Sequence, residues 1–198
     1  MPARCFVAID LPSGTQALLA RAGEAFLADA PSWTGEKWVR PRLMHVTVRF
    51  AGPVPDPAVP ELLEALAAEL AGARAFGMRL EAVHAVPAAR RASMLWAGIG
   101  GDVNAGRELQ ASVERVLARR FGVEPERRAY TPHVTLVRAR SPRQAPDDAL
   151  AAASDVLQGA GKEADGFLSV RLITLYASTL GEGGPHYERL GEVPLVGM

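Results

Sequence analysis

The chain contains the stretch His45-Val46-Thr47-Val48, and a near copy of it, His133-Val134-Thr135-Leu136, follows a little under half of the 198 residues later. In both copies a polar residue alternates with an aliphatic one, which is the period-2 pattern of a half-buried β-strand. The histidine and the threonine of each copy therefore share one strand face, about 7 Å apart. The pattern predicts two related strands that each present an imidazole and a hydroxyl on an open face.

The repetition carries more information than either copy alone. A single His-x-Thr arises often by chance, but this chain has four histidines in total, and two of them occupy matching tetrads. If the repeat reflects internal symmetry, a pseudo-twofold axis would bring the two strands together. His45, His133, Thr47 and Thr135 would then face one cleft.

Two histidines and two threonines in one cleft suit the cleavage of a phosphoester. Histidine has an ordinary pKa of about 6.5, so one neutral imidazole can accept a proton from an attacking water while a second, protonated, donates to the departing oxygen. A threonine hydroxyl can donate to a phosphate oxygen without adding charge. The repeated positions hold no carboxylate that would repel the anion.

With these motifs and their flanks, the chain resembles the 2H phosphoesterase superfamily, and within it the bacterial and archaeal RNA 2′,3′-cyclic phosphodiesterases, historically called 2′-5′ RNA ligases. The resemblance covers nearly the whole chain. Besides the paired motifs it rests on these stretches: Arg4 to Pro12, Lys37-Trp38-Val39, Arg49-Phe50-Ala51-Gly52, Thr131-Pro132, Leu175 to Leu180 and Gly183 to Tyr187.

The resemblance implies an α+β fold formed by a single bilobal domain over residues 1–198. Two lobes related by a pseudo-twofold axis would line a central cleft with antiparallel sheets and carry their helices outside. One motif would lie in each lobe, at residues 45–48 and 133–136.

The resemblance also implies a metal-independent and cofactor-free enzyme. It would open RNA 2′,3′-cyclic phosphate ends to 2′-phosphomonoesters, with His45 as proton donor and His133 as proton acceptor. Thr47, Thr135 and Arg138 would bind the substrate. The same site would join a cyclic phosphate end to a 5′-hydroxyl, which is 2′-5′ ligation. The expected partners are RNA ends or small nucleotides with a 2′,3′-cyclic phosphate.

Arginines surround both motifs, at positions 40, 42, 49, 127, 128, 138 and 140. Most of them have an equally good interpretation as solvated surface residues. Strict alternation would point Arg138 away from His133, so its expected role requires the strand to twist, bulge or end near Val137. Arg49 has the parity that points into the cleft.

Other candidate side chains receive a structural interpretation. Trp38, Phe50 and Tyr130 could each stack on a base, but a place in the core or at the rim is favoured. His84 is expected to be a packed or edge histidine, and His186 to lie in a turn.

Composition fits a compact cytoplasmic enzyme, which we expect to be a monomer. A net charge of zero and a pI near 6.9 argue against binding long nucleic acid by bulk electrostatics, though a short RNA end remains compatible. Neither a secretory signal nor a membrane-spanning run is evident, so we expect no membrane association. The single cysteine, Cys5, is expected to be a small buried residue.

Two other functions remain open. A metal-dependent hydrolase is disfavoured because neither motif has His-x-x-x-His or His-x-Asp spacing and the chain has no cysteine cluster. A module that binds a nucleotide or an RNA end without turnover is the main alternative.

The periodicity predicts alternating strands and helices. Ser13 is expected to cap the first helix, and Gly122 to end the third. Strands are predicted over 4–10, 37–39, 44–50, 76–86, 94–99, the second motif, 167–178 and 187–193, and helices over 14–28, 59–70, 103–121 and 147–157.

Overall fold

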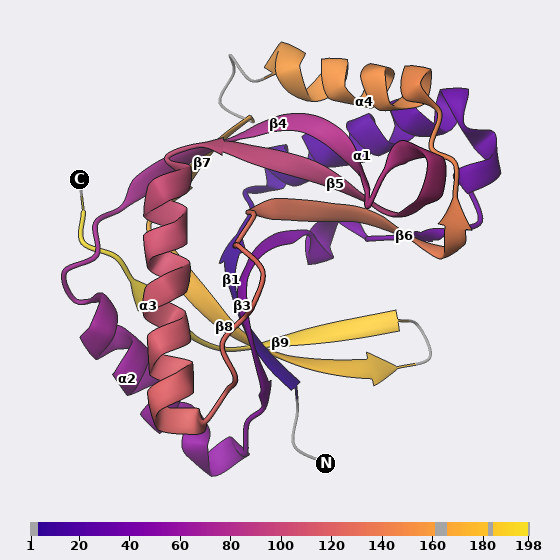
Figure 1. Cartoon of the computed structure of the whole chain (residues 1–198). Helices are drawn as coiled ribbons and strands as arrows, with labels where there is room; N and C mark the ends of the chain where they lie inside the picture. Colours follow the sequence, from indigo (N-terminus) through magenta and orange to yellow (C-terminus); the bar gives the residue numbers. More distant parts are fainter. Residues whose placement is uncertain (1–3, 161–165, 182–183, 198) are drawn as a thin grey trace.

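The computed structural model of the chain describes residues 4–160, 166–181 and 184–197. The structure is the expected α+β fold (Figure 1). The α-helices are α1 (Ser13–Asp29), α2 (Val59–Leu70), α3 (Val103–Phe121) and α4 (Asp147–Ala160). The strands are β1 (Arg4–Asp10), β2 (Lys37–Trp38), β3 (His45–Pro53), β4 (Phe76–Val86), β5 (Ala92–Gly101), β6 (His133–Arg143), β7 (Phe167–Val170), β8 (Leu172–Gly181) and β9 (Gly184–Pro194).

The strands form one antiparallel sheet in the order β7-β4-β5-β6-β3-β1-β8-β9, with β2 paired to β6. Its centre is the pair β3–β6, the two motif strands, where Val46 lies opposite Val134. We call β3, β1, β8 and β9 the first lobe and β6, β5, β4 and β7 the second lobe. The two lobes therefore continue into each other, and each contains one motif strand.

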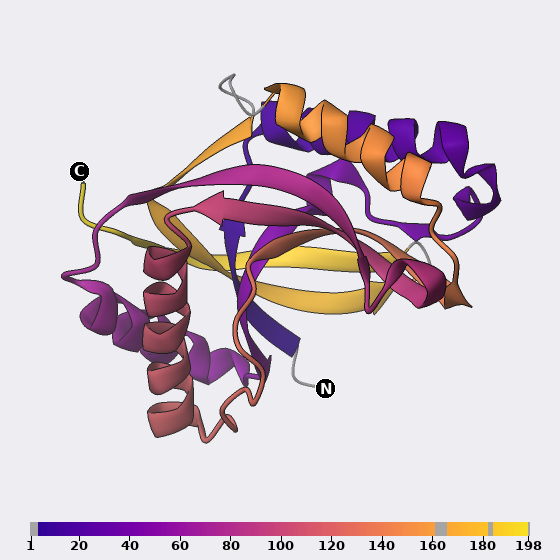
Figure 2. The same cartoon turned by 45° about the horizontal axis from the view of Figure 1, so that its top comes forward.

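The helices pack in two pairs on the outside of the lobes. Helices α1 and α4 contact each other, and α4 packs on β4. Helices α2 and α3 also contact each other, and α2 packs on β9 while α3 packs on β3. Figures 1 and 2 show these pairs on different sides of the molecule. Helix α1 packs on α4, which covers β4 of the second lobe, whereas β8 and β9 belong to the first lobe. The lobes are therefore interlaced in sequence, and neither is formed by one half of the chain.

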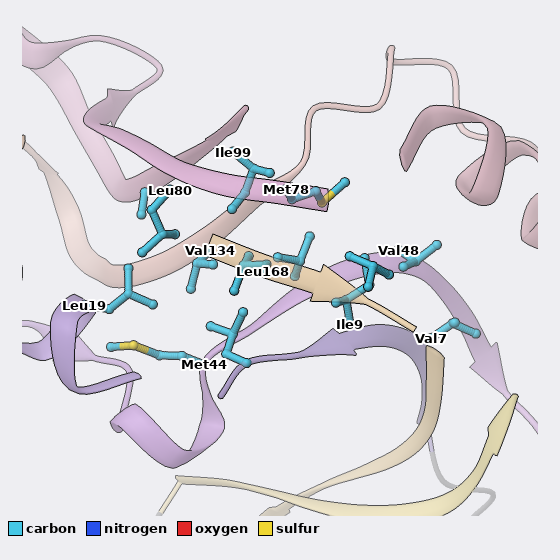
Figure 3. Packing of buried hydrophobic residues seen from close by; sticks show 14 of the residues in the cluster. Val7, Ile9, Leu19, Met44, Val48, Met78, Leu80, Ile99, Val134 and Leu168 are labelled. Atoms are coloured by element: carbon cyan, nitrogen blue, oxygen red, sulfur yellow. The ribbon is translucent and has the colours of Figure 1, made fainter. Parts of the chain in front are cut away.

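The hydrophobic core runs without a break beneath both motif strands (Figure 3). Val46 and Val134 have no exposed surface, and Val48 is almost completely buried, as the alternation predicts. Cys5 is also buried, which confirms its expected place as a small core residue. This packing makes the motif strands a rigid support for the polar residues on their other face.

Most element boundaries match the periodicity. Helix α3 ends before Gly122, whose φ of +63° is the left-handed conformation that glycine adopts readily. The prediction for Ser13 is wrong, because Pro12 occupies the N-cap position of α1 and no side chain caps that helix. The single strand expected over 167–178 is divided at Arg171 into β7 and β8, which pair with different lobes.

Candidate active site

The same irregularity interrupts both motif strands. Between β1 and β3, the partners step from Val7–Arg49 to Ala8–Thr47, so Val48 is an extra residue in β3. Between β5 and β6, Leu136 is the extra residue in the same way. Each motif therefore contains a β-bulge at its fourth residue, and a bulge reverses the alternation of the side chains that follow it.

The two bulges decide which residues enter the cleft. Arg138 lies on the same side as His133 and Thr135, which meets the requirement for a bulge near Val137. In the first motif the residue that corresponds to Arg138 is Phe50, and the Arg49 side chain is turned away from the cleft. The Arg49 guanidinium instead lies 3.1 Å from a carboxylate oxygen of Glu114, on α3.

The side chains of both motifs line a hollow of about 390 Å³, which is the candidate active site and which we call the catalytic hollow. It brings together all five predicted site residues, His45, Thr47, His133, Thr135 and Arg138. Antiparallel pairing with Val46 opposite Val134 sets each histidine across from the threonine of the other motif. The remaining wall is formed by Arg4, Phe6, Val39, Leu43, Met44, Phe50, Ser178, Leu180 and Tyr187.

Both imidazoles are fixed by the same hydrogen bond. The Nδ1–H of His45 donates to the carbonyl oxygen of Leu43 at 2.8 Å, and the Nδ1–H of His133 donates to that of Thr131 at the same distance. A carbonyl can only accept, so Nδ1 carries the hydrogen and Nε2 is left for proton transfer. The Nε2 atom of His45 lies 3.1 Å from the Thr47 hydroxyl.

The surroundings of the two histidines differ. The ring of His45 packs against Phe6, with 4.9 Å between ring centroids, and makes a T-shaped contact with Tyr187, with 5.5 Å between centroids. The ring of His133 is stacked on the indole of Trp96 at 3.7 Å, with an angle of 15° between the planes. Trp96 thus holds one face of the His133 imidazole and fixes its plane.

An acidic residue lies beside His45. Asp10 is paired with His45 across β1 and β3. The Asp10 carboxylate accepts hydrogen bonds from the hydroxyls of Thr174 and Tyr176, at 2.9 and 2.7 Å, and lies 3.0 Å from the Arg189 guanidinium. This network fixes the position of the Asp10 carboxylate at the His45 end of the cleft.

The pKa values of both histidines are lowered from 6.5. Burial is the main cause for each, because it disfavours the charged imidazolium, and the positive charge of Arg138 adds to it. For His45, the Leu43 carbonyl and the Asp10 carboxylate oppose this shift of the pKa.

These shifts predict the pH dependence of catalysis. An acid–base pair needs one protonated histidine, and this form is lost as the pH rises through that residue's pKa. It also needs one neutral histidine, and this form is lost as the pH falls through the second residue's pKa. Since both pKa values lie below 6.5 in the free protein, we expect kcat/KM to peak below pH 6.5. A bound anionic phosphate raises both pKa values, so the kcat profile should lie at higher pH. Initial rates across pH would test this, and a kcat/KM maximum on the alkaline side would contradict it.

The three aromatic candidates have different places. Tyr130 donates its hydroxyl to the Thr47 carbonyl at 3.0 Å, and Trp38 donates its indole N–H to the Trp33 carbonyl at 2.9 Å, so both are structural. Phe50 is 61% exposed and lines the hollow. It is therefore the aromatic residue at the rim that has a face available to a base.

The other histidines lie outside the hollow. His84, on β4, and His186, on β9, are both exposed and are not among its lining residues. Within the part of the chain that the structure describes, no group of three or more His, Cys, Asp or Glu side chains could hold a metal ion. No helix among the described residues has the length and hydropathy to cross a bilayer.

A family model, the 2′-5′ RNA ligase superfamily, matches residues 28–175. The chain belongs to this superfamily. It is 34% identical over 171 residues to the RNA 2′,3′-cyclic phosphodiesterase of Aeropyrum pernix, covering 85% of this chain and 93% of that protein. It is 28% identical over 188 residues to the protein of the same name from Methanothermobacter thermautotrophicus, covering 94% and 96%. The resemblance read from the motifs is thus confirmed.

Solved structures of other proteins have the same fold as this chain. Escherichia coli LigT complexed with 3′-AMP superposes with a TM-score of 0.71 at 22% identity, over 98% of this chain and 99% of that one. The apo form of LigT gives 0.70 over 98% of both chains. The curled antiparallel sheet with the motifs at its centre is therefore the fold shared with LigT.

Some residues of the site escaped the sequence analysis. Asp10, Trp96 and Tyr187 reach the histidines from β1, β5 and β9, and their roles depend on strand register. One signal was available for Asp10, an acidic residue at the end of an otherwise apolar strand, because such a residue needs polar partners.

Proposed function

We propose that this protein is an RNA 2′,3′-cyclic phosphodiesterase that converts 2′,3′-cyclic phosphate ends to 2′-phosphomonoesters by acid–base catalysis without a metal, and that residues 1–198 act as one bilobal unit. One observation carries the proposal. A single hollow gathers both motif histidines, both motif threonines and Arg138. The relatives named for this activity match along most of the chain.

The reaction follows from the groups present. Neutral His133 accepts a proton through Nε2 from a water molecule, whose oxygen forms a bond to phosphorus. The bond between phosphorus and the 3′ oxygen breaks, and protonated His45 donates a proton to that oxygen. Arg138 and the two threonine hydroxyls donate hydrogen bonds to the non-bridging oxygens, which carry the negative charge.

The assignment of His45 as the proton donor is supported by its neighbours. The donor must hold its proton in the substrate complex, so it benefits from a nearby negative charge. Asp10 supplies that charge beside His45 and raises its pKa against the effect of burial, whereas no acidic group acts on the pKa of His133 among the described residues. We therefore assign His133 as the proton acceptor.

A 5′-hydroxyl can replace water in the same mechanism. The product is then a 2′-5′ phosphodiester between two RNA ends rather than a 2′-phosphate. Both reactions use the same groups, so ligation belongs to the proposed function as a second outcome of one site.

The direct test is hydrolysis of an oligoribonucleotide ending in a 2′,3′-cyclic phosphate, with an excess of metal chelator present. We expect turnover to be unaffected by the chelator and to release a 2′-phosphate, identified by nuclease mapping or ³¹P NMR. Turnover that disappears with the chelator and returns with added metal would indicate a metal-dependent hydrolase. Binding of the oligoribonucleotide without turnover would favour the RNA-end binding module.

A further inference from the structure

A second hollow, of about 330 Å³, adjoins the catalytic one. Its walls come from β3, β5, β6, α3 and the segment of residues 122–132 that connects α3 to β6. Its lining residues include five that also line the catalytic hollow, namely Thr47, Phe50, His133, Thr135 and Arg138. A phosphate held by the threonines and Arg138 is therefore accessible from both hollows, as a phosphate with a nucleoside on either side requires.

The second hollow reaches only one of the two catalytic histidines. Its described lining residues include His133 but not His45. With His133 as the proton acceptor, this is the side from which the nucleophile approaches phosphorus. An occupant of the second hollow can thus present a hydroxyl to Nε2 of His133.

The segment of residues 122–132 has a defined position over this hollow. The Tyr130 hydroxyl donates to the Thr47 carbonyl at 3.0 Å, which ties the segment to the first motif strand. The Glu126 carboxylate accepts hydrogen bonds from the backbone N–H groups of Arg127 and Arg128, at 3.0 and 3.3 Å, and lies 3.8 Å from the Arg49 guanidinium. The one carboxylate in the lining is therefore already satisfied by neighbouring groups.

Two features of the second hollow suit a nucleotide. The Arg128 guanidinium is exposed at its wall and makes no hydrogen bond or ion pair with the described residues. It can bind a phosphate of an RNA backbone next to the one that Arg138 and the threonines hold. Phe50, between the two hollows, has an exposed ring on which a base can stack.

We propose that the second hollow binds the nucleoside that carries the attacking 5′-hydroxyl, and that Arg128 binds the next phosphate of the same strand. This rests on the proposed function. His133 accepts the 5′-hydroxyl proton, the 5′ oxygen forms a bond to phosphorus, the bond to the 3′ oxygen breaks, and His45 protonates that oxygen. The product is a 2′-5′ phosphodiester, and no further reactant is needed.

The test compares two products of one reaction. An oligoribonucleotide ending in a 2′,3′-cyclic phosphate is incubated with increasing concentrations of a second oligoribonucleotide that has a 5′-hydroxyl and a blocked 3′ end. Hydrolysed and ligated products are quantified for the unaltered protein, for Arg128→Gln and for Arg127→Gln. Arg127 is a matched control because it is the adjacent exposed arginine and is not among the residues lining either hollow.

In the unaltered protein we expect ligated product to increase with acceptor concentration and to reach a plateau. For Arg128→Gln, the acceptor concentration that gives half-maximal ligation should rise about tenfold, since a hydrogen-bonded charge contact is lost. Hydrolysis without acceptor should be unchanged, and Arg127→Gln should alter neither product.

Other outcomes overturn the proposal in distinguishable ways. If the protein hydrolyses the cyclic phosphate but forms no ligated product, or if Arg128→Gln leaves ligation unchanged, the acceptor assignment fails while the proposed function stands. If Arg128→Gln slows hydrolysis of the oligoribonucleotide but not of a mononucleoside 2′,3′-cyclic phosphate, the hollow binds the upstream strand of the substrate instead. If neither product forms, the proposed function itself fails.

Discussion

Alanine in place of His45 or His133 is expected to lower kcat/KM for cyclic phosphate hydrolysis by about 10²- to 10⁴-fold, which is the usual contribution of a positioned general acid or base. Both imidazoles direct Nε2 toward proton transfer because Nδ1 donates to a carbonyl two residues earlier in the chain. Steady-state rates with a cyclic-phosphate-terminated oligoribonucleotide measure the effect.

The double variant tests whether the histidines act together. Both serve one transition state, so removing the second should cost much less than removing the first. Fully multiplicative losses would indicate that the two residues contribute independently, which would contradict a shared acid–base mechanism.

The chain offers two matched controls for these variants. His84→Ala and His186→Ala remove exposed histidines that do not line the catalytic hollow, so rates should be unchanged. The His45 ring packs against Phe6 and Tyr187, so His45→Gln is also needed to separate lost chemistry from lost packing. An active His45→Gln or His133→Ala protein with a normal melting curve would remove that residue from the mechanism.

The motif residues were predictable from sequence because the information is local. The period-2 alternation places His45 and Thr47 on one strand face whatever the strand pairs with, and the copy at His133 and Thr135 repeats it. The burial of Val46 and Val134 followed from the same pattern. Helix α3 was predictable for a similar reason, since helical periodicity runs up to a glycine that can adopt positive φ.

The directions of the side chains just past each motif were not predictable from strand alternation, because they depend on the neighbouring strand. Alternation pointed Arg49 into the cleft and Arg138 out of it. The extra residues Val48 and Leu136 reverse both expectations, and they arise from the register of β3 with β1 and of β6 with β5. A bulge is a property of a strand pair, so one strand's sequence did not reveal it.

The interlacing of the lobes was not predictable from sequence either, because it also depends on which elements pack together. Two motifs in matching positions suggested two halves, each folding around its own strand. Helix α1 packs against α4, although most of the chain separates them. The amphipathic pattern of α1 specified which face is buried but not against which partner, because hydrophobic burial is not directional.

Replacing Arg138 by glutamine is expected to lower kcat/KM by about 10- to 100-fold, the cost of losing a charge-assisted contact to the phosphate. Arg138 reaches the hollow only because of the bulge at Leu136, and its position in the second motif is occupied by Phe50 in the first. Arg138 is therefore the one arginine on a motif strand among the described residues that line the catalytic hollow. The first motif has no equivalent arginine there that could replace it.

The same variant should also change the pH profile, which distinguishes an electrostatic role from a structural one. The charge of Arg138 lowers the pKa of both histidines in addition to the effect of burial. Without that charge, both pKa values rise and the kcat/KM optimum should move to higher pH. Arg138→Lys keeps the charge but loses the planar fork, so it should retain the pH profile while losing part of the rate.

The control is Arg79→Gln, which removes an exposed arginine of β4 that lies outside the catalytic hollow. It should change neither rate nor optimum. If Arg138→Gln lowers the rate without moving the optimum, the guanidinium acts by holding the strand rather than through its charge. If it changes neither quantity, the phosphate is bound without Arg138, and the bulge at Leu136 has no part in catalysis.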